Sequence, residues 1–240
     1  MKAISFTPKH LLYLLLGCDL ALAALYGLSL HIGGIDVHQL FDMDQEANIP
    51  AWFSSTKFFC IAALLGLYGP EALGRIGVPR FLPLLGAIVF LFLSMDESAQ
   101  VHERVGRALR GNDFVPTVRN DRGAWVFVYL VVALPFLYLA ARQLPKLWLN
   151  YRVLTISGLA GCTFIACGAA GVELIADQFL RGYEQIQYYY KLSVLAEETS
   201  ELLGTSLLLF AAFTLTRPAQ QPTLQWQPAQ MATGQAASVR

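Results

Sequence analysis

Charged residues are scarce in this chain. They make up 14% of its 240 residues, whereas soluble domains carry about 25%. Hydrophobic residues make up 55% of the sequence. This composition excludes an ordinary soluble domain and predicts an integral membrane protein, whose immediate partner is the lipid bilayer.

An excess of charge of either sign is also absent, because the formal net charge is zero. Nothing therefore indicates a nucleic-acid partner. Cysteine is rare, all four cysteines lie inside apolar runs, and no two of them form a C-x-x-C pair. We expect neither a disulfide framework nor a zinc knuckle. The four are Cys18, Cys60, Cys162 and Cys167.

Long apolar runs dominate what is present. A spanning helix needs roughly 20 apolar residues, and six runs approach this length, which predicts an all-α bundle of six transmembrane helices. The runs are Leu11–Leu30, Ala51–Tyr68, Phe81–Met95, Ala124–Ala141, Val153–Val172 and Leu192–Leu215. The third is short, so we expect its helix to continue through its acidic end, and Pro135 predicts a kink in the fourth.

These runs divide the chain into a transmembrane domain, residues 1–216, and a tail, residues 217–240. The tail is rich in Gln, Pro, Ala and Ser, a composition that predicts disorder. The first run has a second interpretation, because residues 15–18 (Leu-Leu-Gly-Cys) resemble a lipoprotein cleavage box. The chain stays apolar beyond this box as far as Leu30, so we interpret the run as a span.

The basic residues between the runs predict the orientation. With the N-terminus inside, nine lysines and arginines flank the spans on the cytoplasmic side and seven on the other. The positive-inside rule therefore favours a bacterial inner-membrane protein with both termini in the cytoplasm. Most acidic residues then fall at the periplasmic end of the bundle.

The most polar stretch beside a span is 94–103. Three carboxylates and one histidine lie within its last eight residues, and membrane segments rarely carry so many ionisable groups without a function. On one straight helix, Asp96 and Glu103 share a stripe, with Glu97 and His102 at its edges. Alternatively, Ser94 and Glu97 form a capping box, and a new interfacial helix begins at Ser94.

Two further acidic clusters lie at the same predicted depth. Glu197, Glu198 and Glu201 span about 100° of one helix surface, and they repel one another unless a cation, a proton or an arginine compensates. Glu173 and Asp177 share another face, which small residues continue toward the other membrane surface. That face runs through Ala169, Ala166, Cys162 and Gly158. Such residues let a neighbouring helix approach closely.

The first outer loop carries alternating acids at Asp42, Asp44 and Glu46. They resemble the start of a calcium loop, but the glycine and closing glutamate of an EF-hand are missing. Glu46 is a candidate loop ligand for the acidic site. Asn48 and Pro50 favour the start of the next helix.

Two charges, Asp19 and Lys57, fall deep inside the first and second runs. An unpaired charge at that depth is costly, so we hypothesise that they pair. The alternative is a proton path that leads to the acidic site.

Two sequence blocks resemble those of a family of uncharacterised bacterial multi-pass membrane proteins. The first is F-D-x-D-x-E-x-N-x-P-x-W-F-S-S at 41–55, and the second is S-x-D-E-x-x-x-x-H-E at 94–103. The resemblance covers most of the chain except the tail. It implies a membrane fold and no particular activity.

A divalent metal site is the function that these residues favour, because carboxylate-rich helical sites with few histidines suit hard or borderline cations. The predicted ligands are Asp96, Glu97, His102, Glu103, Glu173, Glu197, Glu198, Glu201 and Glu46. Such a site suits a metal-dependent hydrolase or oxidoreductase that acts on a lipid-like substrate, with an anionic headgroup held by the arginines of 104–122. The E-x-x-H pairs of di-iron bundles are missing.

Two other classes of function stay open. The first is a proton- or cation-coupled transporter or sensor, although no broken helix pair or inverted repeat is visible in the sequence. The second is an accessory subunit whose charges form structural ion pairs only.

Overall fold

The computed structural model describes residues 7–32, 35–45, 47–109, 124–172, 175, 179 and 187–217. Helices form nearly all of these ranges, and no strand occurs in them, so the all-α prediction is confirmed. In chain order they are α1 (Pro8–Ile32), α2 (Ile35–Phe41), α3 (Ile49–Gly74), α4 (Phe81–Ala99), α5 (Val101–Ala108), α6 (Ala124–Ala141), α7 (Leu144–Asn150), α8 (Arg152–Ile165), the π-helical η1 (Ala166–Val172), α10 (Gln187–Phe213) and the 3-10 turn η3 (Thr214–Thr216).

Five helical segments are long and apolar enough to cross a membrane: α1, α3, α4, α8 with the start of η1, and α10 with η3. The helices α6 and α7 meet at a 50° bend and make a sixth if the pair is one span. The bend lies between Ala141 and Leu144, whereas Pro135 sits inside α6 without ending it. The helix of the third apolar run, α4, continues through its acidic end to Ala99, as expected.

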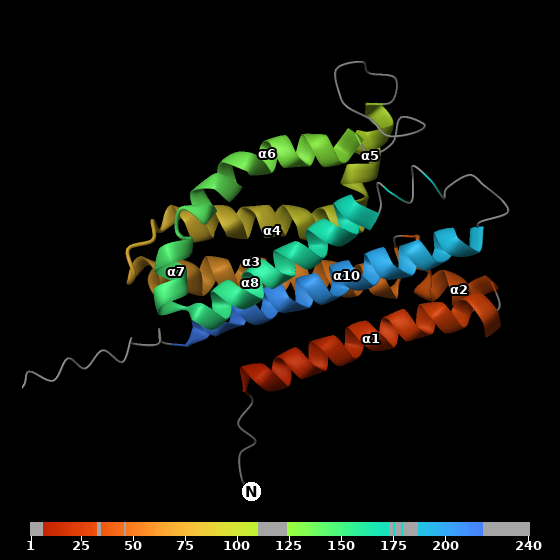
Figure 1. Ribbon diagram of the computed structural model, residues 1–240, viewed down its shortest axis with the longest axis horizontal. Helices are drawn as coiled ribbons and strands as arrows, with labels where there is room; N and C mark the ends of the chain where they lie inside the picture. Colours follow the sequence, from red (N-terminus) through yellow and green to blue (C-terminus); the bar gives the residue numbers. More distant parts are fainter. Residues whose placement is uncertain are drawn as a thin grey trace, which may run out of the picture.

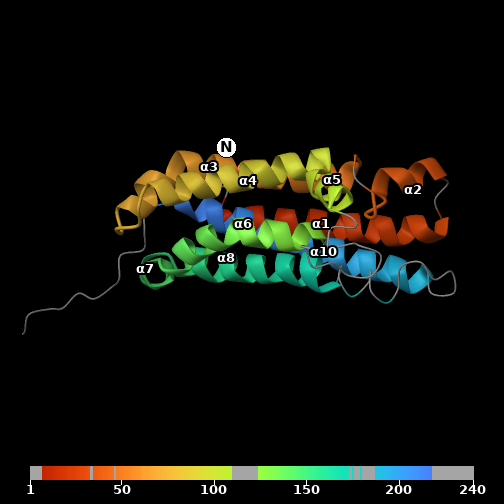
Figure 2. The same cartoon turned by 90° about the horizontal axis from the view of Figure 1, so that it is seen from above.

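The bundle is built around α10, which contacts α1, α3, α8 and η1. Half of its span, 50%, is buried inside the protein. Figure 2 shows α3 and α4 side by side along one edge and α8 along the opposite edge. In the described chain, α6 packs chiefly on α4 and α5.

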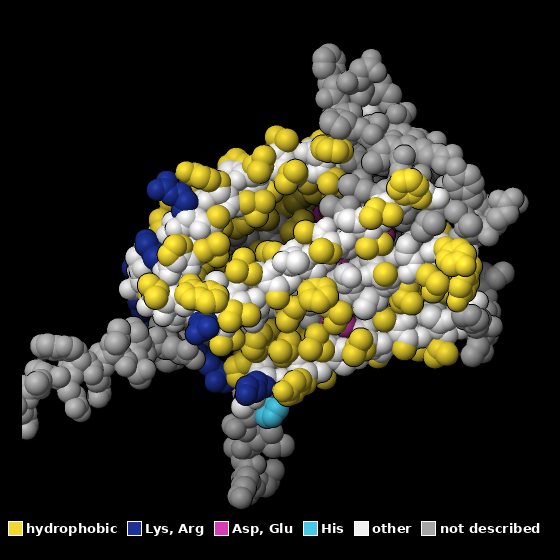
Figure 3. All heavy atoms as spheres, viewed as in Figure 1, with side chains coloured by type: hydrophobic (Ala, Val, Ile, Leu, Met, Phe, Trp, Pro, Cys, Tyr) yellow, Lys and Arg dark blue, Asp and Glu magenta, His cyan; other side chains and the backbone are white. Residues whose placement is uncertain are grey.

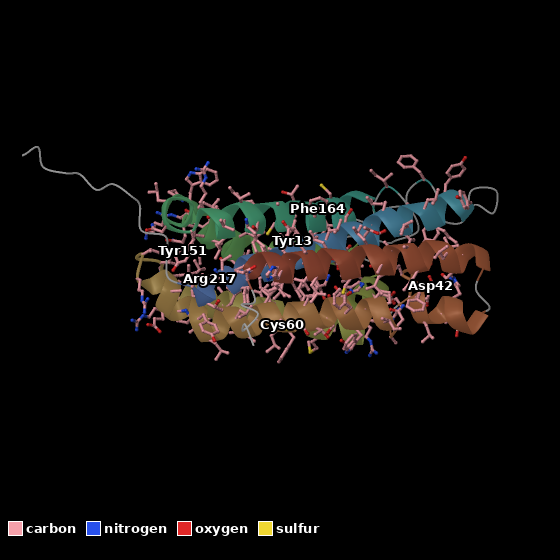
Figure 4. The ribbon with its side chains drawn as sticks, turned by 90° about the horizontal axis from the view of Figure 1, so that it is seen from below. Tyr13, Asp42, Cys60, Tyr151, Phe164 and Arg217 are labelled. Carbon is pink, nitrogen blue, oxygen red and sulfur yellow. The ribbon has the colours of Figure 1, made fainter. Side chains whose placement is uncertain are left out.

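The two ends of the bundle differ in what they carry. The start of α1, the end of α10, α7 and the turn between α3 and α4 lie at one end, which we call the terminal end (Figure 1). The helices α2 and α5 lie at the other, the loop end. Figure 4 shows Tyr151 and Arg217 at the terminal end and Asp42 at the loop end.

Serines join α3 to α4 near the loop end. The Ser55 hydroxyl donates to the Ser94 carbonyl oxygen (2.7 Å), and the Ser94 hydroxyl donates to the Ser55 carbonyl oxygen (2.9 Å). The Ser98 hydroxyl donates to the Ser55 hydroxyl (2.8 Å). Small polar residues allow this close approach and bond across it. Ser94 therefore lies inside α4, and the alternative that a helix begins there is wrong.

A second close approach joins α8 to α10. A Cβ atom added at Gly161 would lie 2.7 Å from the Gly204 carbonyl oxygen and 2.8 Å from Leu208 Cγ. The face predicted to make this contact is wrong, because Cys162 and Ala166 are exposed and Gly158 has no neighbour within 4 Å of an added Cβ. The prediction assumed a regular α-helix through the whole span, whereas the chain becomes π-helical from Ala166 to Val172.

Replacing Gly161 by alanine tests this contact. The added methyl group meets backbone, so we expect Gly161→Ala to lower the free energy of unfolding by about 1–3 kcal/mol. Gly158→Ala is the matched control, because its methyl group has open space and alanine favours helix. Thermal unfolding in detergent compares the two variants, and equal melting temperatures would contradict the proposed packing.

Candidate functional site

A charged network lies at the centre of the bundle. The Lys57 ammonium of α3 donates to Asp19 Oδ1 of α1 at 2.9 Å, and the Ser206 hydroxyl of α10 donates to Asp19 Oδ2 at 2.6 Å. Asp19 and Ser206 are 0% exposed and Lys57 is 1% exposed. The hypothesis that Asp19 and Lys57 pair is confirmed.

The Lys57 ammonium has no hydrogen-bond donor to spare. Its other two bonds go to the Leu202 carbonyl oxygen (2.7 Å) and the Ser206 hydroxyl (3.3 Å), and an ammonium has three donors. The Phe53 ring lies 4.7 Å from the nitrogen, which adds a cation–π contact. Toward the terminal end, a purely apolar cluster follows the pair. It comprises Leu15, Phe58, Ile61, Leu208, Leu209 and Ala212.

A double-mutant cycle tests the central pair. Lys57→Met leaves the Asp19 carboxylate buried without its counter-charge, so we expect a loss of about 3–5 kcal/mol in the free energy of unfolding. Asp19→Asn combined with Lys57→Met should recover part of this loss, because no charge then stays buried. Denaturant unfolding in detergent measures the coupling. Strictly additive effects would show that the two side chains do not interact.

Asp96 holds the corner between α4, α5 and α6. Its Oδ1 accepts hydrogen bonds from the His102 backbone N–H (2.7 Å) and the Tyr129 hydroxyl (3.2 Å), and it lies 3.3 Å from His102 Nδ1. The Trp125 ring packs between His102 and Tyr129, at 5.0 Å and 5.4 Å between centroids. One carboxylate therefore joins three helices.

The chain turns at Gln100, which has a left-handed φ of 54°. The predicted stripe through Asp96 and Glu103 assumed one straight helix and is wrong, because this residue separates α4 from α5. Glu103 is exposed and pairs with Arg107 at 2.8 Å. The structure does not bring Glu103 to the other carboxylates.

Carboxylates from α4 and α10 lie within electrostatic range of one another on the loop-end side of the central pair. Glu97 of α4 is partly buried, lies near the Ser54 side chain, and lies within electrostatic range of Lys57 and His102. Glu198 of α10 is partly buried too, and lies within electrostatic range of Glu97. Glu197, Glu201 and Asp44 also act on it. We call Glu97, Glu197, Glu198 and Glu201 the carboxylate cluster.

The π-helical η1 packs directly on this cluster. A Cβ atom added at Gly168 would lie 2.8 Å from the Glu197 carbonyl oxygen and 3.0 Å from Glu201 Cγ. Single π-helical turns within α-helices are frequent at functional sites. Three of the predicted acidic residues, Glu46, Glu173 and Asp177, lie outside the described residues.

Two buried oxygens near the cluster have no hydrogen-bond partner among the residues that the structure describes. They are the hydroxyls of Tyr26, which is 0% exposed, and of Thr199. The carboxylates of Asp42, Asp44 and Glu198 lie within electrostatic range of the Tyr26 hydroxyl. The sequence prediction missed both residues, although one signal was available. Tyr26 follows Asp19 by seven residues and Thr199 precedes Ser206 by seven, which places each on the helix face of the central network.

The described side chains do not form a closed metal site. Among them, no three of His, Cys, Asp and Glu converge closely enough to hold a metal ion. The side chains of Asp96 and Asp19 are already engaged in structural hydrogen bonds. A cation at the carboxylate cluster would therefore be held by few protein ligands at a time.

The fold and the site define an all-helical protein with membrane-length apolar helices and a polar centre inside the bundle. The chain belongs to the family described as Domain of unknown function (DUF8692), whose model matches residues 11–216. No curated protein and no solved structure matches the chain. The matched region spans the whole described bundle apart from its ends, in agreement with the expected uncharacterised family.

Proposed function

We propose that this protein binds a divalent cation at the carboxylate cluster, within a multi-pass protein of the bacterial inner membrane. The observation that carries the proposal is the meeting of partly buried carboxylates from α4 and α10 beside an ammonium that is already saturated. Like charges held together away from bulk water need a compensating cation or proton. Lys57 has no N–H left to donate to these carboxylates, because its three donors are used by Asp19, Leu202 and Ser206.

A hydrated hard cation suits the cluster better than a tightly ligated one. Structural zinc takes four protein ligands in a closed tetrahedron, which conflicts with the spacing of the described side chains. Magnesium keeps several waters and is commonly held by one or two carboxylates, and calcium and manganese also prefer oxygen ligands. Glu97 and Glu198 are the ligands that we propose, with Glu197, Glu201 and His102 beside them.

A reaction on a lipid-like substrate follows as the second part of the proposal. Figure 3 shows a hollow between α6 and α8 that is lined by hydrophobic side chains, with acidic side-chain atoms visible beside it. A hydrocarbon chain fits such a surface, and its polar end would then lie toward the carboxylates. A bound divalent cation would supply Lewis-acid activation of water or of the substrate, as in a metal-dependent hydrolase or oxidoreductase.

The charges at the ends of the bundle support the proposed orientation. Figure 3 shows the described lysines and arginines gathered mainly at the terminal end. The predicted spans likewise assign nine basic residues of the sequence to the cytoplasmic side and seven to the other. The positive-inside rule then puts both termini in the cytoplasm and the carboxylate cluster near the periplasm. Glu46, Glu173 and the arginines of 104–122 would join the site from the outer loops.

Transport of protons or cations is the alternative, favoured by the charged pair at mid-depth. The apolar cluster of Leu15, Phe58 and Ile61 on the terminal side of this pair weighs against it, because a conducted ion needs polar groups along its path. This apolar cluster therefore suits a protein whose carboxylate cluster is reached from the loop end only. A purely structural role is the outcome that remains if no cation binds.

Cation binding is tested with purified protein in nanodiscs. We expect saturable binding of Mn²⁺ by electron paramagnetic resonance, and competition by Mg²⁺ or Ca²⁺. Glu198→Gln should weaken binding about tenfold or more, because it removes one negative charge from the ligands and cation affinity depends on the number of charged ligands. Glu201→Gln should also weaken it.

The matched control is Glu103→Gln, which removes a carboxylate of the same kind from an exposed pair outside the cluster. This variant should bind as the wild type does. Equal loss in all three variants would place the cation elsewhere, and an absence of saturable binding in the wild type would leave the structural role.

A further inference from the structure

We propose that the Glu198 side of the carboxylate cluster, together with the hydroxyls of Tyr26 and Thr199, binds a primary ammonium group. The ammonium would belong to an amine-bearing substrate of the centre described above. The inference therefore rests on the proposed function in one respect, that Glu198 faces a space that cations can reach.

The protein itself contains a template for this site. The Lys57 ammonium is held by a carboxylate of α1, a hydroxyl of α10, a carbonyl oxygen and an aromatic ring. Those groups use all three donors of the ammonium and stabilise its charge. Three hydrogen-bond acceptors, one of them charged, together with an aromatic ring thus suffice to hold a buried ammonium in this bundle.

The same kinds of group recur two helical turns nearer the loop end. Tyr26 lies seven residues after Asp19 on α1, and Thr199 lies seven residues before Ser206 on α10. Seven residues return a helix to the same face, and α1 packs along α10. The two hydroxyls therefore stand above the two side chains that bind one another in the central network.

These upper groups differ from the lower ones in having no ammonium or other hydrogen-bond partner among the described residues. The Tyr26 and Thr199 oxygens have no hydrogen-bond partner and are buried. An unsatisfied buried oxygen is unfavourable, and such groups in native proteins indicate a missing water, ion or ligand. The carboxylates of Asp42, Asp44 and Glu198 lie within electrostatic range of the Tyr26 hydroxyl, and of these Glu198 is next to Thr199 on α10.

An ammonium satisfies these groups better than a metal ion does. Hydroxyl oxygens accept hydrogen bonds readily, and no three carboxylate, histidine or cysteine side chains of the described ranges converge on a point that could hold a metal. An ammonium donates three hydrogen bonds to acceptors spread around it. A quaternary amine carries the same charge but has no N–H, so it would leave both hydroxyls unpaired.

Binding is measured by calorimetry on the full chain in phosphatidylcholine nanodiscs, whose lipid lacks a primary amine. The probes are n-octylammonium, its N,N,N-trimethyl analogue and n-octanol, each corrected by a titration of empty nanodiscs. We expect saturable binding of octylammonium at about tenfold higher affinity than either analogue, as a hydrogen-bonded charge predicts. Equal binding of octylammonium and the trimethyl analogue overturns the proposal.

A short amine separates two sources of the ammonium. Ethylammonium has almost no hydrocarbon, so its binding would identify a free amine as the ligand. Binding of octylammonium alone would identify an amine carried by a lipid-like molecule. Either result supports the ammonium site.

Matched variants locate the site. Tyr26→Phe and Thr199→Val each remove one oxygen with little change of shape, and we expect each to weaken octylammonium binding about fivefold to tenfold. The controls are Tyr13→Phe and Thr56→Val, which make the same changes at exposed positions of α1 and α3. Equal effects of site and control variants would overturn the assignment.

The result of the Mn²⁺ titration distinguishes this inference from the proposed function. Mn²⁺ binding without octylammonium binding overturns the ammonium site and leaves the cation centre intact. Octylammonium binding without Mn²⁺ binding supports the ammonium site and overturns the divalent cation. The octylammonium comparison needs no variant, so it holds even if a substituted protein fails to fold.

Discussion

A charged pair that water does not reach ties three helices together at the centre of this bundle. Moving Asp19 and Lys57 out of water costs several kcal/mol for each ion, which close contact offsets only when every remaining donor and acceptor is bonded. The Ser206 hydroxyl and the Leu202 carbonyl oxygen complete that bonding. The rest of the interior follows from this constraint. The core on one side of the pair is apolar, and the carboxylates on the other side receive no hydrogen bond from Lys57, whose three donors are already used.

Much of the architecture was predictable because it depends on the length of the apolar runs and on the cost of burying charged groups. Runs near the thickness of a bilayer predicted the spans, and the scarcity of other deep charges left Asp19 and Lys57 as each other's only partners. The proximity of Glu97 to the glutamates of α10 was also predictable from their position along the helices. Carboxylates at the same depth of a small bundle lie close together when they point into its interior. These features follow from the cost of removing charged groups from water, and the residue types in the sequence indicate that cost.

The details of the site depend on backbone events that sequence patterns do not show. The left-handed Gln100 separates Glu103 from Asp96, and a run of amino acids with no glycine gives no warning of it. The fifth span becomes π-helical at η1. A face predicted with 100° per residue through the whole span therefore selected Cys162 and Gly158 instead of Gly161, which contacts α10. Tyr26 and Thr199 were missed because hydroxyls within apolar helices usually find partners. Their lack of partners appears only when the surrounding side chains are placed.

The serine contacts between α3 and α4 link the two sequence blocks that mark this family resemblance. The first block ends at Ser54 and Ser55, and the second begins at Ser94, so each supplies half of one reciprocal set of hydrogen bonds. A substitution in one block is therefore expected to disturb hydrogen bonds that the other block makes. A recombinant that took one from a diverged relative would leave buried hydroxyls and backbone oxygens mismatched across the α3–α4 contact. We therefore expect selection to act on the two segments together, although Ser55 and Ser94 lie 39 positions apart in the chain.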